Sequence, residues 1–272
     1  MCTLAAINFN VMAKQIGIIK LEGTLGGINF YTRKGKPVAR KAGGGFTKES
    51  IKNSPTMERV RENNTEFGDC SKVKKCLKAS LHPFLYQYKE GELHARMMQV
   101  FQQIKMCDTI SARGKRNVGV GIATPMGELL FQKFVYTPKR SVSKTLMGSG
   151  SLDWDSFSYS IRRFAIKNVR FARSATHFEV SFGVLCFDFN TLDYALFMGT
   201  PLLIGRDFEA TSFSLSPTNL PVGTGSQLAF VGLKFYQEVN GVLYLLQNEN
   251  AIGLELVGSR LVPPAHSSLK VE

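Results

Sequence analysis

Short apolar runs separated by turn residues, which continue from Ser151 to residue 260, are the feature that most restricts the fold of this chain. Within 177–189, large apolar side chains occupy every second position, at Phe178, Val180, Phe182 and Val184. This period of two is typical of a strand with one buried face.

The clearest turn lies in FYQEVNGVLYLL, where Asn240-Gly241 separates two alternating segments. This pair favours the type I′ turn of a β-hairpin. Several short strands at this spacing predict an antiparallel β-sandwich or small barrel over residues 151–260.

The N-terminal part has a different pattern. Glycines punctuate apolar residues between 14 and 42, and FYTRKGKPVAR predicts a hairpin that turns at Lys34-Gly35, because glycine adopts positive φ without steric cost. Residues 55–81 predict a helix capped by Ser54, with Pro55 at its first position. We expect its apolar stripe to include Val60, Phe67, Val73 and Leu77, and Gly68 to mark the approach of another backbone.

A second helix is predicted over residues 93–108, where apolar residues recur at spacings of three and four. It would form an αα-hairpin with the first helix. The stretch 118–147 is rich in glycine and favours strands, and Gly-Ser-Gly-Ser at 148–151 indicates a turn or linker. The fold class that these patterns predict is α+β: an N-terminal β-hairpin plus an αα-hairpin, followed by an antiparallel β-sandwich or small barrel.

We therefore expect four segments along the chain. Met12 begins MAKQIGIIKL, which reads as a natural start, so residues 1–11 are expected to be an upstream extension. Residues 12–147 would form a basic hairpin and helical region, with a flexible joint at Gly43–Gly45. Residues 151–260 would form the β-rich domain and residues 261–272 a tail.

The positive charge is concentrated in the first half of the chain. Residues 1–140 contain 24 Lys and Arg against 10 Asp and Glu, whereas residues 141–272 contain 10 against 11. This asymmetry suggests that the first half faces an anionic partner. The candidate contacts with a partner or with phosphate lie on the hairpin, on the first helix and in the loop SARGKRN: Phe30, Tyr31, Arg33, Lys34, Lys36, Arg40 and Lys41; Lys72 and Lys75, with Lys74 and Lys78 beside them; and Arg113, Lys115 and Arg116.

These clusters have two interpretations. Basic residues beside aromatic ones can hold nucleic acid through phosphate contacts and stacking. They can instead form a solvated face or a surface that docks on an acidic neighbouring subunit, and no named nucleic-acid motif accompanies them.

The sequence contains no set of catalytic, cofactor-binding or metal-ligating residues that we can identify. The four histidines are scattered, P-loop and GxSxG motifs are absent, and Asp153 and Asp155 beside Trp154 are typical of a turn or a helix cap. The five cysteines are irregularly spaced and are expected to be reduced thiols. Neither a signal peptide nor an apolar run of about 18 residues occurs, so we expect a cytoplasmic, non-enzymatic protein without a membrane span.

Three N-terminal motifs carry a family resemblance: MAKQIGIIKLEGTLGGINFYTRKGKPVARKAGG, RVRENNTEFGDCSKVKKCLKASLHPFL and SARGKRNV. They resemble an uncharacterised family common in Bacteroidota, domain of unknown function 6266. The resemblance covers about residues 12–118 and resumes weakly in GLKFYQEVNGVLYLL, residues 232–246. It supports Met12 as the start and implies no activity, cofactor or catalytic residue. Cys70 and Cys76 depart from the family pattern, which suggests that these thiols are incidental.

Two functions from different classes follow from these patterns. The first is a non-catalytic structural or assembly protein that forms protein–protein contacts through its basic N-terminal hairpin and helices, as a homo-oligomer or within a larger assembly, because a free hairpin leaves strand edges for a partner. The alternative is a sequence-nonspecific nucleic-acid-binding protein that uses the basic clusters. A carbohydrate- or peptide-binding sandwich around Trp154 is a third and weaker alternative, since a single Trp is more often part of a core.

Overall fold

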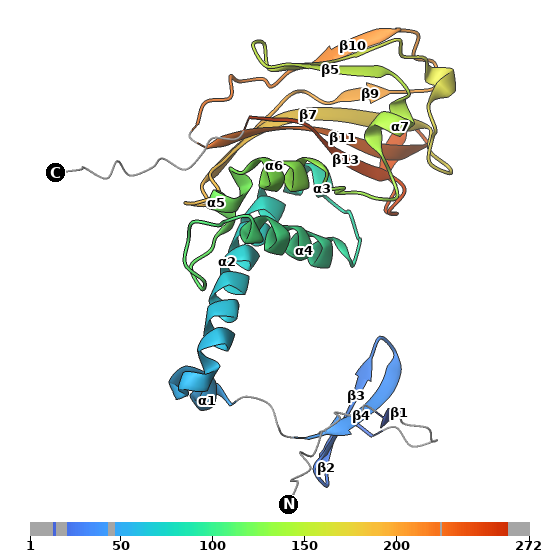
Figure 1. Cartoon of the computed structure of the whole chain (residues 1–272). Helices are drawn as coiled ribbons and strands as arrows, with labels where there is room; N and C mark the ends of the chain where they lie inside the picture. The colour runs from blue at the N-terminus through green and yellow to red at the C-terminus, as the bar shows by residue number, and fades with distance from the viewer. Residues whose placement is uncertain (1–12, 15–20, 43–46, 224, 261–272) are drawn as a thin grey trace, which may run out of the picture. The chain divides into compact units, whose positions relative to one another are not determined.

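The computed structural model describes residues 13–14, 21–42, 47–223 and 225–260. The chain divides into two compact units, residues 1–58 and residues 59–272 (Figure 1). The expected extension at 1–11, the start at Met12, the joint at Gly43–Gly45 and the tail at 261–272 lie outside the described residues.

The first unit contains a small antiparallel sheet with the strand order β1-β4-β3-β2. Its strands are β1 (Ala13–Lys14), β2 (Gly23–Leu25), β3 (Ile28–Arg33) and β4 (Lys36–Lys41), and they are followed by α1 (Lys48–Asn53) and the 3-10 helix η1 (Pro55–Met57). The predicted hairpin is confirmed, because β3 and β4 pair across Lys34 and Gly35, whose φ angles are 50° and 74°. Two consecutive positive φ angles define a type I′ turn.

The helices of the second unit begin with α2 (Glu58–Ser80), the short α3 (His82–Leu85) and α4 (Leu93–Met106). The two long helices were predicted correctly, but the start of the first was not: α2 begins at Glu58, Ser54 makes no side-chain cap bond, and Pro55 belongs to η1. The apolar stripe of α2 was partly wrong, because Phe67 is 56% exposed while Glu66 is fully buried. Gly68 was also interpreted wrongly, since a Cβ at this position would meet nothing within 4 Å.

The prediction of strands over residues 118–147 was wrong, because this stretch forms α5 (Val118–Ile122), α6 (Pro125–Gln132) and α7 (Val142–Leu146). Each helix is capped by a polar side chain that accepts a backbone N–H bond: Asn117, Thr124 and Ser141. The glycines allow close helix packing. A Cβ on Gly121 would lie 2.0 Å from the carbonyl oxygen of Ile104, and one on Gly127 would lie 1.9 Å from that of Gly121.

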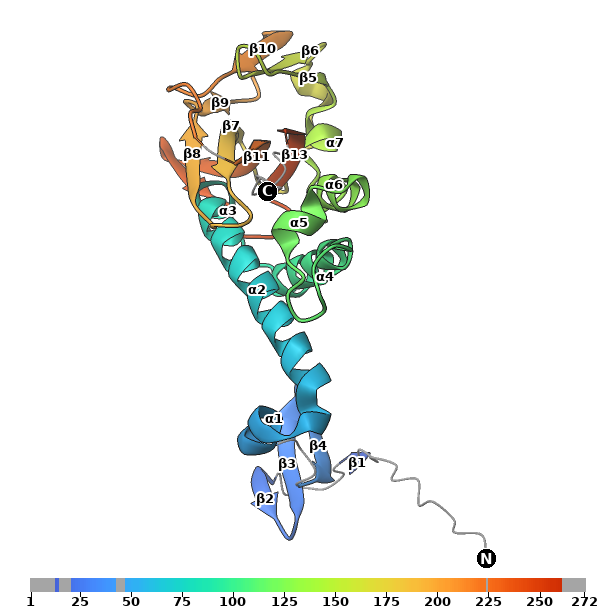
Figure 2. The ribbon, with the colours of Figure 1, turned by 60° about the vertical axis from the view of Figure 1, so that its left-hand side comes forward.

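The strands of the second unit form two antiparallel sheets. The smaller sheet has the order β10-β6-β5 and contains β5 (Ser149–Asp153), β6 (Ser158–Arg162) and β10 (Ser212–Leu215). The larger, six-stranded sheet curls into a half-barrel (Figure 2). Its members are β7 (His177–Phe187), β8 (Tyr194–Met198), β9 (Leu202–Ile204), β11 (Ser226–Val239), β12 (Val242–Leu245) and β13 (Ile252–Arg260).

The central strands β7 and β11 are buried on both faces. Phe182, Val184 and Val231 belong to the core under the smaller sheet, where the ring of Tyr159 stacks on Phe182 at a centroid distance of 5.9 Å. On the opposite face, Leu185 and Phe230 pack with the helices in a second core. An α+β fold with an antiparallel sheet-rich C-terminal part is therefore confirmed.

The helices and the larger sheet share this second core, so they belong to one compact unit. The division between the units thus lies near residue 58 and differs from the boundary expected at 147–151. Residues 148–151 do not form a linker, because β5 already begins at Ser149.

Contacts from α3 hold strand β11 in place. The ring of Phe84 in α3 lies so close to β11 that a Cβ on Gly232 would come within 2.6 Å of it, and the Nζ of Lys234 donates a 2.8 Å hydrogen bond to the Pro83 carbonyl. The predicted turn between β11 and β12 is confirmed at Asn240-Gly241, whose φ angles are 52° and 78°.

Candidate functional site

The strands β2, β3 and β4 form a ribbon, residues 23–41, whose two faces differ in chemistry. Residues directly opposite in an antiparallel pair share a face, and successive residues alternate between faces. The register therefore places most of the apolar side chains on one face, here called the apolar face: Leu25, Ile28, Phe30, Pro37 and Ala39, with Thr32 and Lys41 at its edges. The other, called the basic face, carries Asn29, Tyr31, Arg33, Lys36, Val38 and Arg40.

The basic face brings together four of the predicted contact residues, Tyr31, Arg33, Lys36 and Arg40. Arg33 is paired with Lys36, and the guanidinium carbon of Arg40 lies 5.6 Å from the centre of the Tyr31 ring. This distance permits a cation–π attraction that positions the arginine over the ring. Lys34 lies in the turn and Lys41 is paired with Ile28, so neither belongs to this face.

No residue among 21–42 is buried. Leu25 is 68% exposed and Ile28 is 43% exposed, and Phe30 is only partly buried. The charge of this segment is strongly positive, with five Lys and Arg residues and one acid, Glu22. The described part of the ribbon is thus an amphipathic sheet that buries none of its own apolar side chains.

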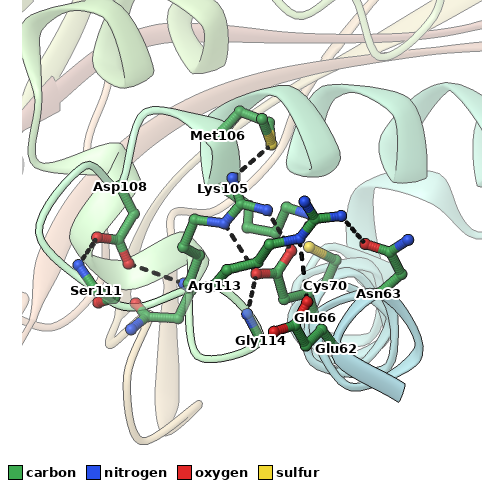
Figure 3. A network of polar contacts seen from close by, with 12 residues as sticks. Glu62, Asn63, Glu66, Cys70, Lys105, Met106, Asp108, Ser111, Arg113 and Gly114 are labelled. Atoms are coloured by element: carbon green, nitrogen blue, oxygen red, sulfur yellow. Dashed lines mark hydrogen bonds and ion pairs between the residues drawn. The ribbon is translucent and has the colours of Figure 1, made fainter. Parts of the chain in front are cut away.

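The predicted basic loop at 111–117 is held against α2 by a buried carboxylate (Figure 3). Both oxygens of Glu66 accept bonds from Arg116, at 2.8 Å from Nε and 2.9 Å from Nη2. The same carboxylate accepts from Lys105 Nζ at 2.7 Å and from the backbone N–H of Gly114 at 2.8 Å. The fully buried carboxylate of Glu66 is therefore held by two cations and one backbone amide.

Glycine is required in this loop at Gly114, which has a φ of 86°. A Cβ there would also lie 2.9 Å from the Cγ of Glu62. At the start of the loop, Asp108 accepts bonds from the backbone N–H groups of Ser111 at 2.9 Å and of Asn117 at 3.0 Å. These contacts fix both ends of the loop.

The electrostatics of the loop follow from this geometry. The hydrogen bonds from Arg116 lower the pKa of Glu66 to about 2, against the opposing effect of burial, and Lys105 adds to the decrease. The bond to Glu66 raises the pKa of Arg116. Both groups are charged at neutral pH, and neither charge is available to an outside ligand.

The other predicted cations have separate surroundings. Arg113 pairs with Glu62 at 3.2 Å and Lys72 pairs with Asp69 at 2.9 Å. Lys75 and Lys115 are exposed. Of these cations, Lys72, Arg113 and Arg116 each pair with an acid beside them.

The sequence interpretation missed Glu66, Lys105 and Asp108. A signal was present, because Glu66, Cys70, Val73 and Leu77 follow helical spacing and all four are buried. An acid on an apolar stripe requires a buried cation as its partner. Lys74 is a second buried charge, and its Nζ lies 2.9 Å from the Nδ1 of His94.

Neither a metal site nor a membrane span is found in the part of the chain that the structure describes. No group of three His, Cys, Asp or Glu side chains there is placed to hold a metal ion. None of the described helices combines the length and the apolar character needed to cross a membrane. Comparison of the chain with protein-family models, with curated proteins and with solved structures found no match.

Proposed function

We propose that the chain is a non-catalytic assembly protein that associates with a second copy of itself through the apolar face of the ribbon. One observation carries the proposal: the ribbon gathers five apolar side chains on one face, where Lys41 is the one cation, and three cations on the other, yet none of the residues 21–42 is buried. Apolar side chains gathered on one face of a sheet gain free energy when another surface covers them, at about 25 cal/mol for each Å² removed from water.

A second copy fits this face for an electrostatic reason. When two sheets pack face to face they lie about 10 Å apart, and their outer faces point away from each other. Packing of two apolar faces would therefore direct Arg33, Lys36 and Arg40 of each copy outward. A contact through the basic faces would instead oppose like charges, which is destabilising.

The expected association is weak. A specific interface buries about 800 Å² on each partner. One ribbon face with five apolar side chains is smaller than this, so we expect a dissociation constant in the range of about 1–100 µM.

Sedimentation velocity over about 1–200 µM protein, the range that brackets this affinity, tests the proposal. The wild type should pass from monomer to dimer, and the double variant Leu25→Asp with Ile28→Asp should remain a monomer, because it would bury unpaired carboxylates. The matched control is Thr24→Asp with Asn29→Asp, a cross-strand pair one position away on the opposite face. A monomeric wild type, or equal effects of the two double variants, would refute the proposal.

The basic face supports a second candidate function, the binding of single-stranded nucleic acid. Three cations around Tyr31 provide phosphate contacts next to a ring on which a base can stack. With three phosphates contacted, the logarithm of the affinity should fall with the logarithm of salt concentration with a slope of about −2.

Fluorescence anisotropy with a labelled oligo-dT at about 50 mM salt, where phosphate contacts are strong, tests this candidate. Replacement of Arg33, Arg40 and Lys36 by Gln should abolish binding. Replacement of Lys72, Lys75 and Lys78 on α2 by Gln removes the same charge and should have little effect. Absence of binding by the wild type, or an equal loss in both triple variants, would eliminate the ribbon as a nucleic-acid site.

A further inference from the structure

The smaller sheet of the second unit carries serine at most positions of its outer face. Each strand contains a Ser-x-Ser pair: Ser149 and Ser151 in β5, Ser158 and Ser160 in β6, and Ser212 and Ser214 in β10. The register places Ser151, Ser160 and Ser214 in one row across the sheet. The Oγ atoms of Ser160 and Ser214 are 3.1 Å apart.

Arginine enters this face in the next row, where Arg162 lies between Ser149 and Ser212. The residues that alternate with these serines point the other way, and Ile161 and Leu215 are buried in the core. The outer face therefore combines hydroxyl groups with cationic side chains at one end.

A hollow of about 560 Å³ lies at this cationic end. It is lined by two short segments, residues 160–163 and residues 211–214, which come from β6 and β10 and the bends beside them. Its volume falls within the range of about 300–1,000 Å³ that is usual for small-molecule sites. Four of its lining residues carry hydroxyl groups.

The backbone at the end of β6 places a second arginine beside the first. Arg162 is paired with Ser212, while the N–H of Phe164 donates to the carbonyl of Thr211 at 2.8 Å. Arg163 is therefore an extra residue in the ladder, and its φ of 56° is left-handed. Such bulges redirect a side chain, and this one adds Arg163 to the lining of the hollow.

The two arginines are the only charged residues among those that line the hollow. Across residues 21–42, 47–223 and 225–260, neither guanidinium has a hydrogen-bond or ion-pair partner. Arg96 and Arg116, by contrast, are each bound by a carboxylate. Two uncompensated arginines that line one hollow attract an oxyanion, and a guanidinium can bind it through paired N–H donors.

We propose that this hollow binds a sugar monophosphate, with the phosphate on Arg162 and Arg163 and the sugar hydroxyls on the serine face. Serine hydroxyls both donate and accept hydrogen bonds, as sugar hydroxyls do. Only residues of the second unit take part, so the site is independent of the ribbon and of the assembly function.

Titration of the ¹⁵N-labelled full chain, followed by the amide signals of residues 160–163 and 211–214, tests the proposal with three probes. Glucose 6-phosphate should shift these signals, inorganic phosphate should bind more weakly, and glucose should bind least. The double variant R162Q/R163Q should weaken the binding of glucose 6-phosphate by at least about tenfold, the size of one lost hydrogen bond to a charged group.

Two control variants separate the contributions. Arg173→Gln removes one exposed positive charge outside the hollow and should leave the affinity unchanged. Ser160→Ala with Ser214→Ala should weaken glucose 6-phosphate but not inorganic phosphate. The proposal is overturned if the wild type shows no shifts at these residues, if Arg173→Gln weakens binding as much as R162Q/R163Q, or if phosphate and glucose 6-phosphate bind equally. The wild-type shifts decide the matter even where a variant folds poorly.

Discussion

Replacement of Glu66 by Gln should strongly destabilise the second unit. The side chain keeps its size, but the negative charge and two acceptor sites are lost. In the wild type, four N–H donors converge on the Glu66 carboxylate: Nε and Nη2 of Arg116, Nζ of Lys105 and the Gly114 amide. The Nε2 group of Gln would itself be a donor that faces donors, and two cations would remain in a buried site without a counter-charge.

Two independent lines give the magnitude. Removal of one partner from a buried ion pair costs about 3–5 kcal/mol in other proteins. The decrease in the pKa of Glu66 from 4.5 to about 2 corresponds to about 3 kcal/mol of stabilisation at neutral pH. Both lines predict that the free energy of unfolding falls by about 3 kcal/mol or more in E66Q.

The same pKa shift predicts a dependence on pH. Because the pKa of Glu66 is lower in the folded state than in the unfolded state, its stabilisation is complete above about pH 5.5 and decreases as the pH falls toward 2. Between about pH 6 and pH 3 the difference between wild type and E66Q should shrink by about 2 kcal/mol. Urea unfolding monitored by circular dichroism at both pH values measures it.

Glu62→Gln is the matched control, one turn earlier on α2. Its carboxylate pairs with Arg113, whose side chain is 48% exposed, and with Arg59, which is 65% exposed. Exposed ion pairs contribute about 0–1 kcal/mol, so E62Q should be nearly neutral. If E66Q loses no more stability than E62Q, or if its effect is the same at both pH values, the assignment of Glu66 as the charged centre of this network is wrong.

Two further predictions follow from the packing and burial of other residues. Gly121→Ala should lower the free energy of unfolding by about 1–3 kcal/mol or more, because its Cβ would collide with the Ile104 carbonyl. Gly68→Ala, which has open space around it, should instead raise the free energy of unfolding by up to about 1 kcal/mol. Thermal unfolding of both variants measures these changes, and a neutral G121A would contradict the close approach of α5 to α4. Brief N-ethylmaleimide labelling at about pH 8, followed by peptide mass spectrometry, should modify Cys76 and Cys107 before Cys70. Burial raises the pKa of Cys70 to about 11, so its thiol stays protonated and inaccessible. Equal labelling rates in the native protein would contradict this.

The elements that were predicted correctly are those whose local chemistry determines their shape. Lys34-Gly35 and Asn240-Gly241 adopt type I′ turns, in which the second position is a glycine that takes a positive φ without steric cost; Asn240 tolerates the first position, and Lys34 occupies it with a φ of 50°. The long helices α2 and α4 were recognised from their apolar spacing. In these cases the deciding information lies within about ten residues.

The prediction failed where a residue's role depends on a distant neighbour. The glycines at 119, 121 and 127 argued against a helix when only their low helix propensity was considered. In the structure Gly121 and Gly127 allow carbonyl groups of Ile104 and of Gly121 itself to approach, and Asn117 and Thr124 cap the helices that contain them. A cap and a close approach outweigh a low helix propensity of about 1 kcal/mol for each glycine.

The candidate site shows the same limit in its electrostatics. The count of charges placed the excess in the first half of the chain, and Arg113 and Arg116 contributed to it. Both are bound by acids of α2 that lie about 50 residues earlier, so much of their charge is compensated within the fold. Arg162 and Arg163 belong to the half with no net positive charge, yet their guanidinium groups have no partner among the described residues. Whether a cation can bind a ligand depends on whether a carboxylate of the protein already pairs with it. That in turn depends on which helix or strand packs beside the cation. A search for ligand sites on this chain should therefore begin at the end of β6, where two arginines have no carboxylate partner among the described residues.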